Sequence, residues 1–152
     1  MDEKDLYIIK RLIENAKISK TALAKELNLS ETAIRKRLKR LERDEIILGY
    51  RAIINYKKTG LYYAIIGLNI EIEKLPTILN ELEKIKEIKL IHLTSGDHDI
   101  LLETITEKID DLTKIYNTLQ KIEGITKIYP SIINLTIKPQ TTIKTSKNTN
   151  TR

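Results

Sequence analysis

Three stretches in the first 43 positions repeat apolar residues every three or four places, which predicts three amphipathic helices. Their apolar positions are, in order, Leu6, Ile9, Leu12 and Ile13; Leu23, Ala24 and Leu27; and Ile34, Leu38 and Leu41. The first helix is expected to end near residues 15–16. Ser19 and Ser30 stand where a hydroxyl caps the second and third helices. Asn28 tolerates the left-handed backbone of a tight turn, so the second and third helices are expected to form a helix-turn-helix.

The segment after the third helix changes to apolar, β-branched residues. Residues 46–54 read IILGYRAII, which predicts a strand or a short wing. Residues 1–55 are therefore interpreted as a winged helix-turn-helix. The alternative is a three-helix packing module with a basic surface.

From residue 61 the pattern alternates between strands and helices. Strands are predicted at 61–72, 88–94, 100–105 and 125–137, and helices at 75–85 and about 108–122, with a turn at 95–99. The order βαββαβ is typical of a ferredoxin-like sandwich with both helices on one face of an antiparallel sheet. The fold class is therefore expected to be α+β. Paired apolar residues such as Ile65 and Ile66 put apolar side chains on both sheet faces, which favours self-association through the second face.

Composition divides the chain in the same places. Residues 1–60 hold 15 Lys/Arg and 9 Asp/Glu, residues 61–137 hold 8 and 12, and residues 138–152 hold 4 and none. We expect a DNA-binding domain with its linker at 1–60, an oligomerisation domain at 61–138, and a flexible basic tail at 139–152. The sequence has no cysteine and no membrane-length apolar run, which suits a cytoplasmic protein without a membrane partner.

The third helix carries the clearest candidate chemistry. From Ala33 to Leu41 it holds five cations and no anion, opposite its apolar face. Phosphates attract such a surface, and the first turns of a helix reach base edges in a major groove. Thr32, Lys36 and Lys39 are predicted to lie nearest the bases, and Arg35, Arg40 and Arg43 to contact phosphates. Ser30, at the cap of this helix, completes the predicted DNA-binding set. Arg37 is expected to form a structural ion pair, and the alternative for the whole face is ordinary solvated surface.

Catalytic patterns are scarce. His92 and His98 have no fixed spacing to a nucleophile, and there is no glycine-rich phosphate loop or HExxH motif. We expect no enzyme activity, no metal and no cofactor.

Several motifs together resemble the Lrp/AsnC, or feast/famine, regulators. They are the D-x-x-I-I-x-x-L pattern from Asp5, the segment LNLSETAIRKRLKRLERDEII, the following Gly49-Tyr50, and Gly-Asp-His-Asp at 96–99. The resemblance covers about residues 2–138. It implies a sequence-specific transcriptional regulator of prokaryotic, archaeal type that binds double-stranded DNA. It also implies homodimers that assemble further into octamers, and modulation by an amino acid or a related metabolite.

The resemblance further implies that the domain at 61–138 also binds an effector, at a site around the turn at residues 94–99. The candidate residues are Thr94, Gly96, Asp97, His98, Asp99 and Ser131. His98 departs from the family pattern, which has an aromatic residue there. Each residue also has a simpler interpretation: Gly96 supplies a positive φ, Asp97 and Asp99 cap amides of the turn, and His98 is exposed without a special task.

Two other functions remain open. Sirohaem decarboxylases resemble this family in fold and use histidines near the sheet, but they have no need for a cationic recognition helix. A protein that coats DNA without choosing sites would share the basic helix and the self-association. A comparison of promoter DNA with bulk DNA separates coating from regulation.

Overall fold

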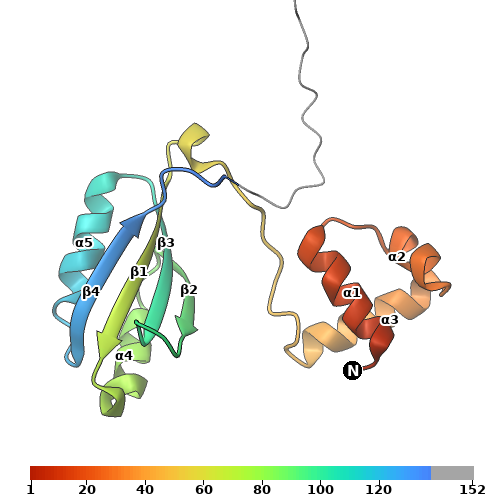
Figure 1. The fold of residues 1–152 in the computed structure, drawn as a ribbon, viewed down its shortest axis with the longest axis horizontal. Coiled ribbons are helices and arrows are strands. Elements are labelled where there is room, and N and C mark those ends of the chain that lie inside the picture. The colour runs from red at the N-terminus through yellow and green to blue at the C-terminus, as the bar shows by residue number, and fades with distance from the viewer. Residues whose placement is uncertain (138–152) are drawn as a thin grey trace, which may run out of the picture. The chain divides into compact units, whose positions relative to one another are not determined.

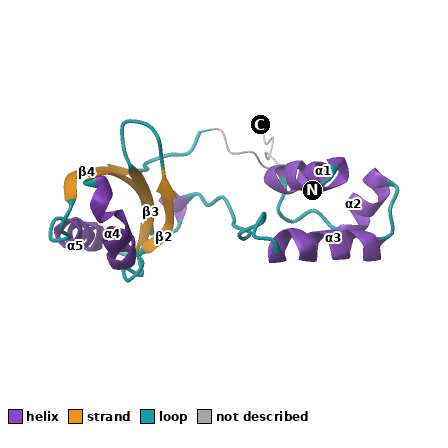
Figure 2. Cartoon of the chain, turned by 90° about the horizontal axis from the view of Figure 1, so that it is seen from below, coloured by secondary structure: helices purple, strands orange, loops and turns teal. Residues whose placement is uncertain are grey.

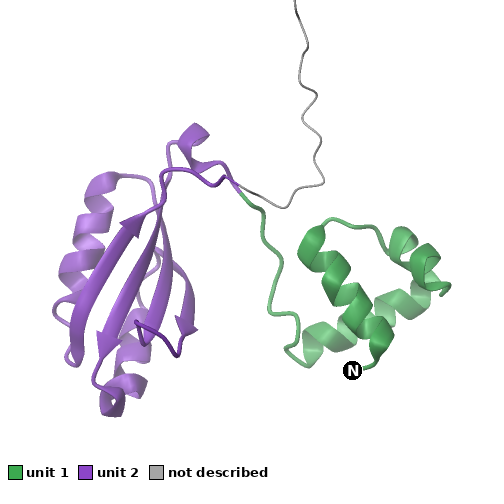
Figure 3. Cartoon of the chain, in the orientation of Figure 1, with its two compact units in different colours: residues 1–53, 138–152 green, residues 54–137 purple. Residues whose placement is uncertain are grey.

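The computed structural model describes residues 1–137, and the predicted tail at 139–152 lies outside this range. The described residues form two compact units, 1–53 and 54–137, which Figure 3 shows in separate colours. No helix within the described range is both long and apolar enough to cross a membrane. Each unit has its own hydrophobic core, so each is described by itself.

The first unit consists of three helices, α1 (Glu3–Glu14), α2 (Lys20–Leu27) and α3 (Glu31–Arg43), as the apolar spacing predicts (Figure 1). Their inward-facing residues form one core, which consists of Ile8, Leu23, Ala24, Ile34, Leu38 and Leu41. Burying a Leu or Ile side chain stabilises a fold by about 1.5–3 kcal/mol. This small core therefore fixes how the three helices pack.

Side-chain caps begin all three helices. Asp2 and Asp5 form a reciprocal capping box at the start of α1. The Ser19 hydroxyl accepts a hydrogen bond from the Ala22 amide, and the Ser30 hydroxyl accepts one from the Ala33 amide. Asn28 ends α2 at φ 52°, in the left-handed region. The two serine caps and the Asn28 turn expected of the helix-turn-helix are thus confirmed.

The predicted wing is wrong. No strand forms between α3 and residue 62; the chain after α3 turns back at Glu45, where φ is 54°. Ile47 packs on the core of the first unit, whereas Leu48 is 88% exposed. A strand needs a neighbour to pair its N–H and C=O groups, and residues 1–61 provide none. The β-branched residues at 46–54 therefore favour an extended backbone, but they do not form the strands of a wing.

The second unit has the predicted order of strands and helices. An antiparallel sheet in the order β2-β3-β1-β4 is built from β1 (Tyr62–Ile70), β2 (Ile88–Leu93), β3 (Ile100–Thr106) and β4 (Ile125–Ile132). The two helices are α4 (Leu75–Leu82) and α5 (Ile109–Leu119), with single 3-10 turns at Tyr56–Lys58 and Ile72–Lys74. The last strand is shorter than predicted, because β4 ends at Ile132 rather than at residue 137.

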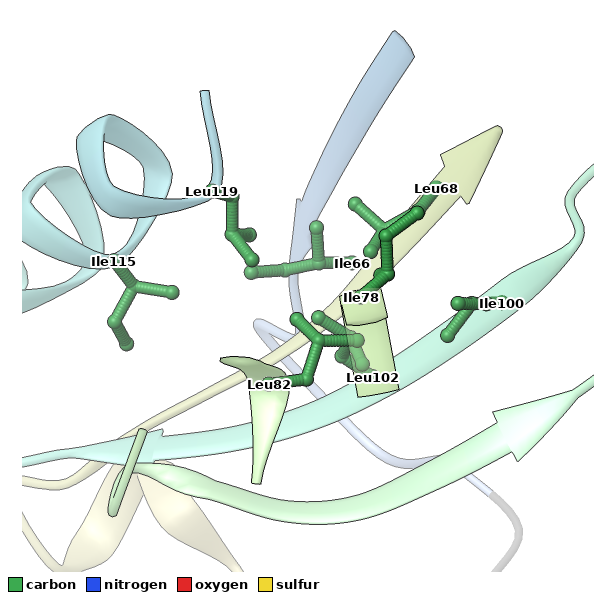
Figure 4. Packing of buried hydrophobic residues seen from close by; sticks show 8 residues of the cluster. All are labelled: Ile66, Leu68, Ile78, Leu82, Ile100, Leu102, Ile115 and Leu119. Atoms are coloured by element: carbon green, nitrogen blue, oxygen red, sulfur yellow. The ribbon is translucent and has the colours of Figure 1, made fainter. Parts of the chain in front are cut away.

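Both helices cover the same face of the sheet (Figure 2). A hydrophobic core lies between the helices and the sheet (Figure 4). It consists of Ile66 and Leu68 from β1, Ile100 and Leu102 from β3, Ile78 and Leu82 from α4, and Ile115 and Leu119 from α5. Successive strand residues point to opposite faces. Ile65, Leu101 and Ile105 therefore lie on the other face, called here the open face, and all three are half-buried.

Candidate nucleic-acid interface and ligand-binding turn

The surface of α3 that points away from the core is cationic. Ile34, Leu38 and Leu41 are buried, while Thr32, Lys36 and Lys39 are exposed on the other side. We call these three residues, with Arg35 and Arg43 beside them, the front of α3. Within residues 1–137, Arg35, Lys36 and Lys39 have no ion pair, so their charges are available to an external anion.

The side of α3 that faces α1 is different, because its arginines are paired. Arg37 Nη1 donates to Asp5 Oδ1 and to Asp2 Oδ2, each at 2.7 Å. Arg40 Nη2 donates to Asp5 Oδ2. The Asp5 side chain is fully buried, and the backbone N–H of Asp2 also donates to it at 2.9 Å. The structural ion pair expected of Arg37 is confirmed, and Arg40 shares it.

The two carboxyl groups of this cluster are held ionised. The Asp5 backbone N–H and the Arg37 guanidinium lower the pKa of Asp2 to about 2. Burial on its own raises the pKa of Asp5. The Asp2 backbone N–H, Arg37 and Arg40 outweigh burial, so the pKa of Asp5 lies below its usual value. The same pairing raises the pKa of Arg37.

The acidic residues of α3 also have partners away from its front. Thr21 of α2 donates its hydroxyl to Glu31 Oε1 at 2.6 Å. The Tyr50 hydroxyl donates to Glu42 Oε1 at 2.8 Å, and burial, followed by this contact, raises the pKa of Tyr50 to about 12. These hydrogen bonds tie α3 to α2 and to the following segment, and they engage Glu31 and Glu42 with partners other than Lys36 and Lys39.

Arg43 stands at the last turn of α3. Its Nε and Nη2 atoms contact Asp44 Oδ1 at 2.8 and 2.7 Å, while the side chain remains 73% exposed. An exposed ion pair of this kind contributes little to stability. Arg43 can therefore exchange Asp44 for a phosphate at low cost.

The turn at residues 94–99 is fastened to the end of β1. Asp99 Oδ2 accepts from the Ile70 amide at 2.9 Å, and the Asp99 amide donates to the Leu68 carbonyl at 2.9 Å. Asn69 donates to the Asp97 carbonyl at 2.8 Å. The Thr94 hydroxyl donates to the His98 carbonyl. The Asp99 carboxylate therefore caps an amide of β1 rather than an amide of the turn, and no local pattern in the sequence predicts the contact of Asn69.

Gly96 does not adopt the positive φ that its simpler interpretation predicts. The glycines with positive φ among residues 1–137 are Gly60 and Gly124. The expectation of a positive φ at Gly96 is therefore wrong. Its exposed position has no neighbour within 4 Å of an added Cβ, so the turn tolerates a larger residue there.

His98 lies on the open face over Gly67. A Cβ at Gly67 would come within 2.6–2.8 Å of three His98 ring atoms. The ring also lies beside Tyr129 of β4, with centroids 4.8 Å apart. Its Nδ1 atom is buried and has no hydrogen-bond partner within residues 1–137. The interpretation of His98 as an exposed histidine is thus wrong, and Gly67 inside a strand was the available signal.

Ser131 also belongs to the open face, but at a different place. It pairs with Ile65 of β1, whereas Tyr129 pairs with Gly67 beneath His98. Ser131 and Tyr129 are two residues apart on one strand and so point to the same face. The candidate residues therefore divide into a turn fastened to β1 and a serine further along the open face.

A carboxylate that sequence reasoning missed lies in the middle of the open face. Glu103 of β3 accepts from the Tyr63 hydroxyl at 2.7 Å and lies 3.3 Å from His92 Nε2. Its side chain is 16% exposed. Only strand pairing brings these three residues together, because they are up to 40 positions apart in sequence. No group of three His, Asp or Glu within residues 1–137 has the arrangement of a metal site.

Family models match both units. The AsnC-type helix-turn-helix domain matches residues 1–42, and the Lrp/AsnC ligand binding domain matches residues 63–143. The HTH-type transcriptional regulator LrpA of Pyrococcus horikoshii is 39% identical over 135 residues, which cover 88% of this chain and 96% of that protein. The HTH-type transcriptional regulator Ptr1 of Methanocaldococcus jannaschii is 35% identical over 133 residues, covering 87% and 84%.

Solved structures share the fold. E. coli AsnC has a TM-score of 0.61 at 24% identity and covers 93% of this chain and 99% of its own. A transcriptional regulator of Neisseria meningitidis, solved as an L-Met complex, has a TM-score of 0.67 at 23% identity and covers 94% and 96%. These relationships support the predicted fold class, α+β with an N-terminal helix-turn-helix.

Proposed function

The chain belongs to the Lrp/AsnC family of DNA-binding transcriptional regulators, and on that premise we propose that the front of α3 reads its operator. The observation that carries the proposal is the separation of charges on α3. Glu31, Glu42 and Arg37 are paired at the flanks, while Arg35 and Lys36 face outward without partners among residues 1–137. The relatives compared are regulators, which favours this function over the sirohaem decarboxylase alternative.

The front contains two kinds of contact residue. Thr32, Lys36 and Lys39 lie on the centre line of the exposed side, where a helix in a major groove meets base edges. Arg43 lies at the last turn of the same line, whereas Arg35 and Arg40 flank it on opposite sides. These three arginines contact phosphates at the edges of the groove. Ser30 caps the helix and supports the free amides of its first turn.

Lys36→Ala is expected to reduce the preference for operator over random DNA by about 10-fold or more, because it removes a base contact. Arg35→Ala is expected to weaken binding to both duplexes equally. It should also reduce the slope of log affinity against log salt by about 0.9, the effect of one lost phosphate. Both are measured by fluorescence anisotropy over a salt series.

Lys10→Ala provides the matched control, because Lys10 is an exposed cation on α1, away from the front. Lys10→Ala should leave both the preference for operator DNA and the salt slope unchanged. If Lys36→Ala weakens operator and random DNA by the same factor, Lys36 contacts phosphate and does not read bases. Equal affinity of the unmutated chain for promoter and bulk DNA at physiological salt would support the coating alternative.

The second unit is proposed to pair two copies through the open face. That face carries half-buried Ile65, Leu101 and Ile105, while α4 and α5 cover only the opposite face. An apolar sheet face is stabilised by burial against a partner. A second copy supplies the same apolar face, so this surface supports a homodimer. Assembly of four dimers into an octamer would use another surface of each dimer. Residues 1–60 then act as the DNA-binding domain and 61–138 as the platform.

An amino acid or related metabolite is proposed to bind at the turn. Thr94, Gly96, Asp97, His98 and Asp99 lie at one end of the sheet, and Ser131 lies on the same open face as the His98 ring. A carboxylate and a hydroxyl suit the ammonium and carboxylate groups of an amino acid. The related N. meningitidis regulator was solved with L-Met, which supports this ligand class.

Thermal unfolding with each of the common L-amino acids tests this assignment. At least one of them is expected to raise Tm, by an amount that grows with its concentration. Asp97→Asn should abolish that shift, because Asp97 supplies the negative charge. Asp110→Asn, an exposed substitution on α5, should not change it. Absence of any shift at millimolar concentrations would contradict amino-acid binding at the turn.

A further inference from the structure

We propose that Asp5 is a positioning residue for DNA contact: its buried carboxylate holds Arg40 so that the outer N–H groups of the guanidinium meet a backbone phosphate. The proposal rests on DNA binding through the front of α3. It assigns a role to a residue of α1 that does not itself reach the DNA. It also gives Arg40 a different role from Arg37: both pair with the Asp5 carboxylate, but only Arg40 contacts a phosphate.

Asp5 can hold two arginines because both of its oxygens are engaged separately. Oδ1 accepts from Arg37 Nη1 at 2.7 Å. Oδ2 accepts from Arg40 Nη2 and from the Asp2 amide, the latter at 2.9 Å. A charged side chain that is fully buried is uncommon unless it is paired. Asp5 is therefore a fixed anchor, and the orientation of each guanidinium is set by the oxygen to which it donates.

Arg37 and Arg40 differ in exposure and in how many of their N–H donors are engaged. Arg37 has 22% of its side chain exposed, and its Nη1 also contacts Asp2. Arg40 is 43% exposed and contacts Asp5 through Nη2 alone. A guanidinium has five N–H donors in a rigid fork. Within residues 1–137, Nε and Nη1 of Arg40 have no acceptor, and they are available for a phosphate while Nη2 stays on Asp5.

The position of Arg40 along α3 suits this use. It lies four residues after Lys36, so both occupy the same side of the helix one turn apart. Arg37 lies closer to the buried face and is half-buried. A flexible arginine loses rotamer freedom when it binds. Asp5 removes part of that freedom beforehand, so the contact of Arg40 with phosphate costs less on binding.

A double-mutant cycle between Asp5→Asn and Arg40→Ala tests the proposal on one duplex over a salt series. Arg40→Ala is expected to reduce the salt slope by about 0.9, so that between 50 and 200 mM salt the wild type loses about three- to fourfold more affinity than the variant. Asp5→Asn is expected to weaken binding several-fold when Arg40 is present and to have no effect in the Arg40→Ala background.

Arg37→Ala is the matched control, because it removes the other guanidinium from the same carboxylate. It should lower Tm and leave the salt slope unchanged. Two results would overturn the proposal: an unchanged slope for Arg40→Ala, or the same loss from Asp5→Asn with and without Arg40. Failure of the wild-type chain to bind any duplex would instead overturn DNA binding itself.

Arg40→Lys keeps the test decisive if Asp5→Asn does not fold. Lysine keeps the charge but has a single ammonium in place of the fork, so it cannot hold Asp5 and a phosphate in the same geometry. Arg37 still pairs with Asp5 in this variant. Arg40→Lys is therefore expected to bind DNA several-fold more weakly than the wild type. Equal affinity would overturn the proposal.

Discussion

Asp5 is the only charged residue among 1–137 that is fully buried, and its surroundings explain the surface of α3. The cationic pattern of α3 and the angular position of Arg37 sufficed to predict a structural ion pair. The identity of the partner did not follow from the sequence, because Asp5 lies 32 positions away. Only the packing of α1 on α3 brings the two together. The contact of Arg40 with Asp5 did not follow from the sequence for the same reason.

Gly67 lies beneath the His98 ring, so a substitution there tests how tightly the ring is held. Gly67→Ala places a Cβ against the His98 ring, where the ring is confined by Tyr129. Displacing a confined ring is expected to lower the free energy of unfolding by about 1–3 kcal/mol. Gly96→Ala, which meets no atom within 4 Å, should change it by less than about 0.5 kcal/mol. Urea unfolding measures both, and equal effects would show that His98 moves aside freely.

Helices were more predictable than strand ends. The apolar spacing and serine caps located α1, α2 and α3 because each helix satisfies its own backbone hydrogen bonds. A strand depends on its neighbour, which local sequence does not specify. That is why residues 46–54 form no wing and why β4 stops at Ile132, where it pairs with Ala64. The His98 and Tyr129 pair depends on the same register between β1 and β4.

The contact between α1 and α3 gives a prediction for pH. The folded pKa of Asp2 is about 2 against a usual 3.8, and the pKa of Asp5 is also lowered. The unfolded chain therefore binds more protons in this window, and stability falls as pH falls from about 4 toward 2. Asp2→Asn keeps a capping side chain and loses the charge.

The difference in unfolding free energy between wild type and Asp2→Asn should therefore be largest above pH 5 and shrink toward pH 2. Urea titrations followed by far-UV circular dichroism over this pH range measure it. A difference that does not change with pH would show that Arg37 and the capping amide do not hold Asp2 ionised.

The two units of the molecule differ in charge and in surface. Residues 1–60 carry the excess of Lys and Arg, and residues 61–137 carry an excess of Asp and Glu together with an apolar sheet face. Composition along the chain indicates the difference in charge without the structure. The sequence does not identify a ligand for the turn at residues 94–99, because the turn is held by hydrogen bonds between side chains and backbone groups that only the pairing of strands brings together.

The most direct test is to select duplexes that the purified chain binds from a random library and to sequence them. Two fronts presented by one dimer should enrich an inverted repeat whose half-sites lie one helical turn apart, at about 10–10.5 base pairs or a multiple of it. Lys36→Ala should blur the bases of each half-site without altering their spacing. Enrichment of no motif, or of a single unpaired half-site, would contradict the account.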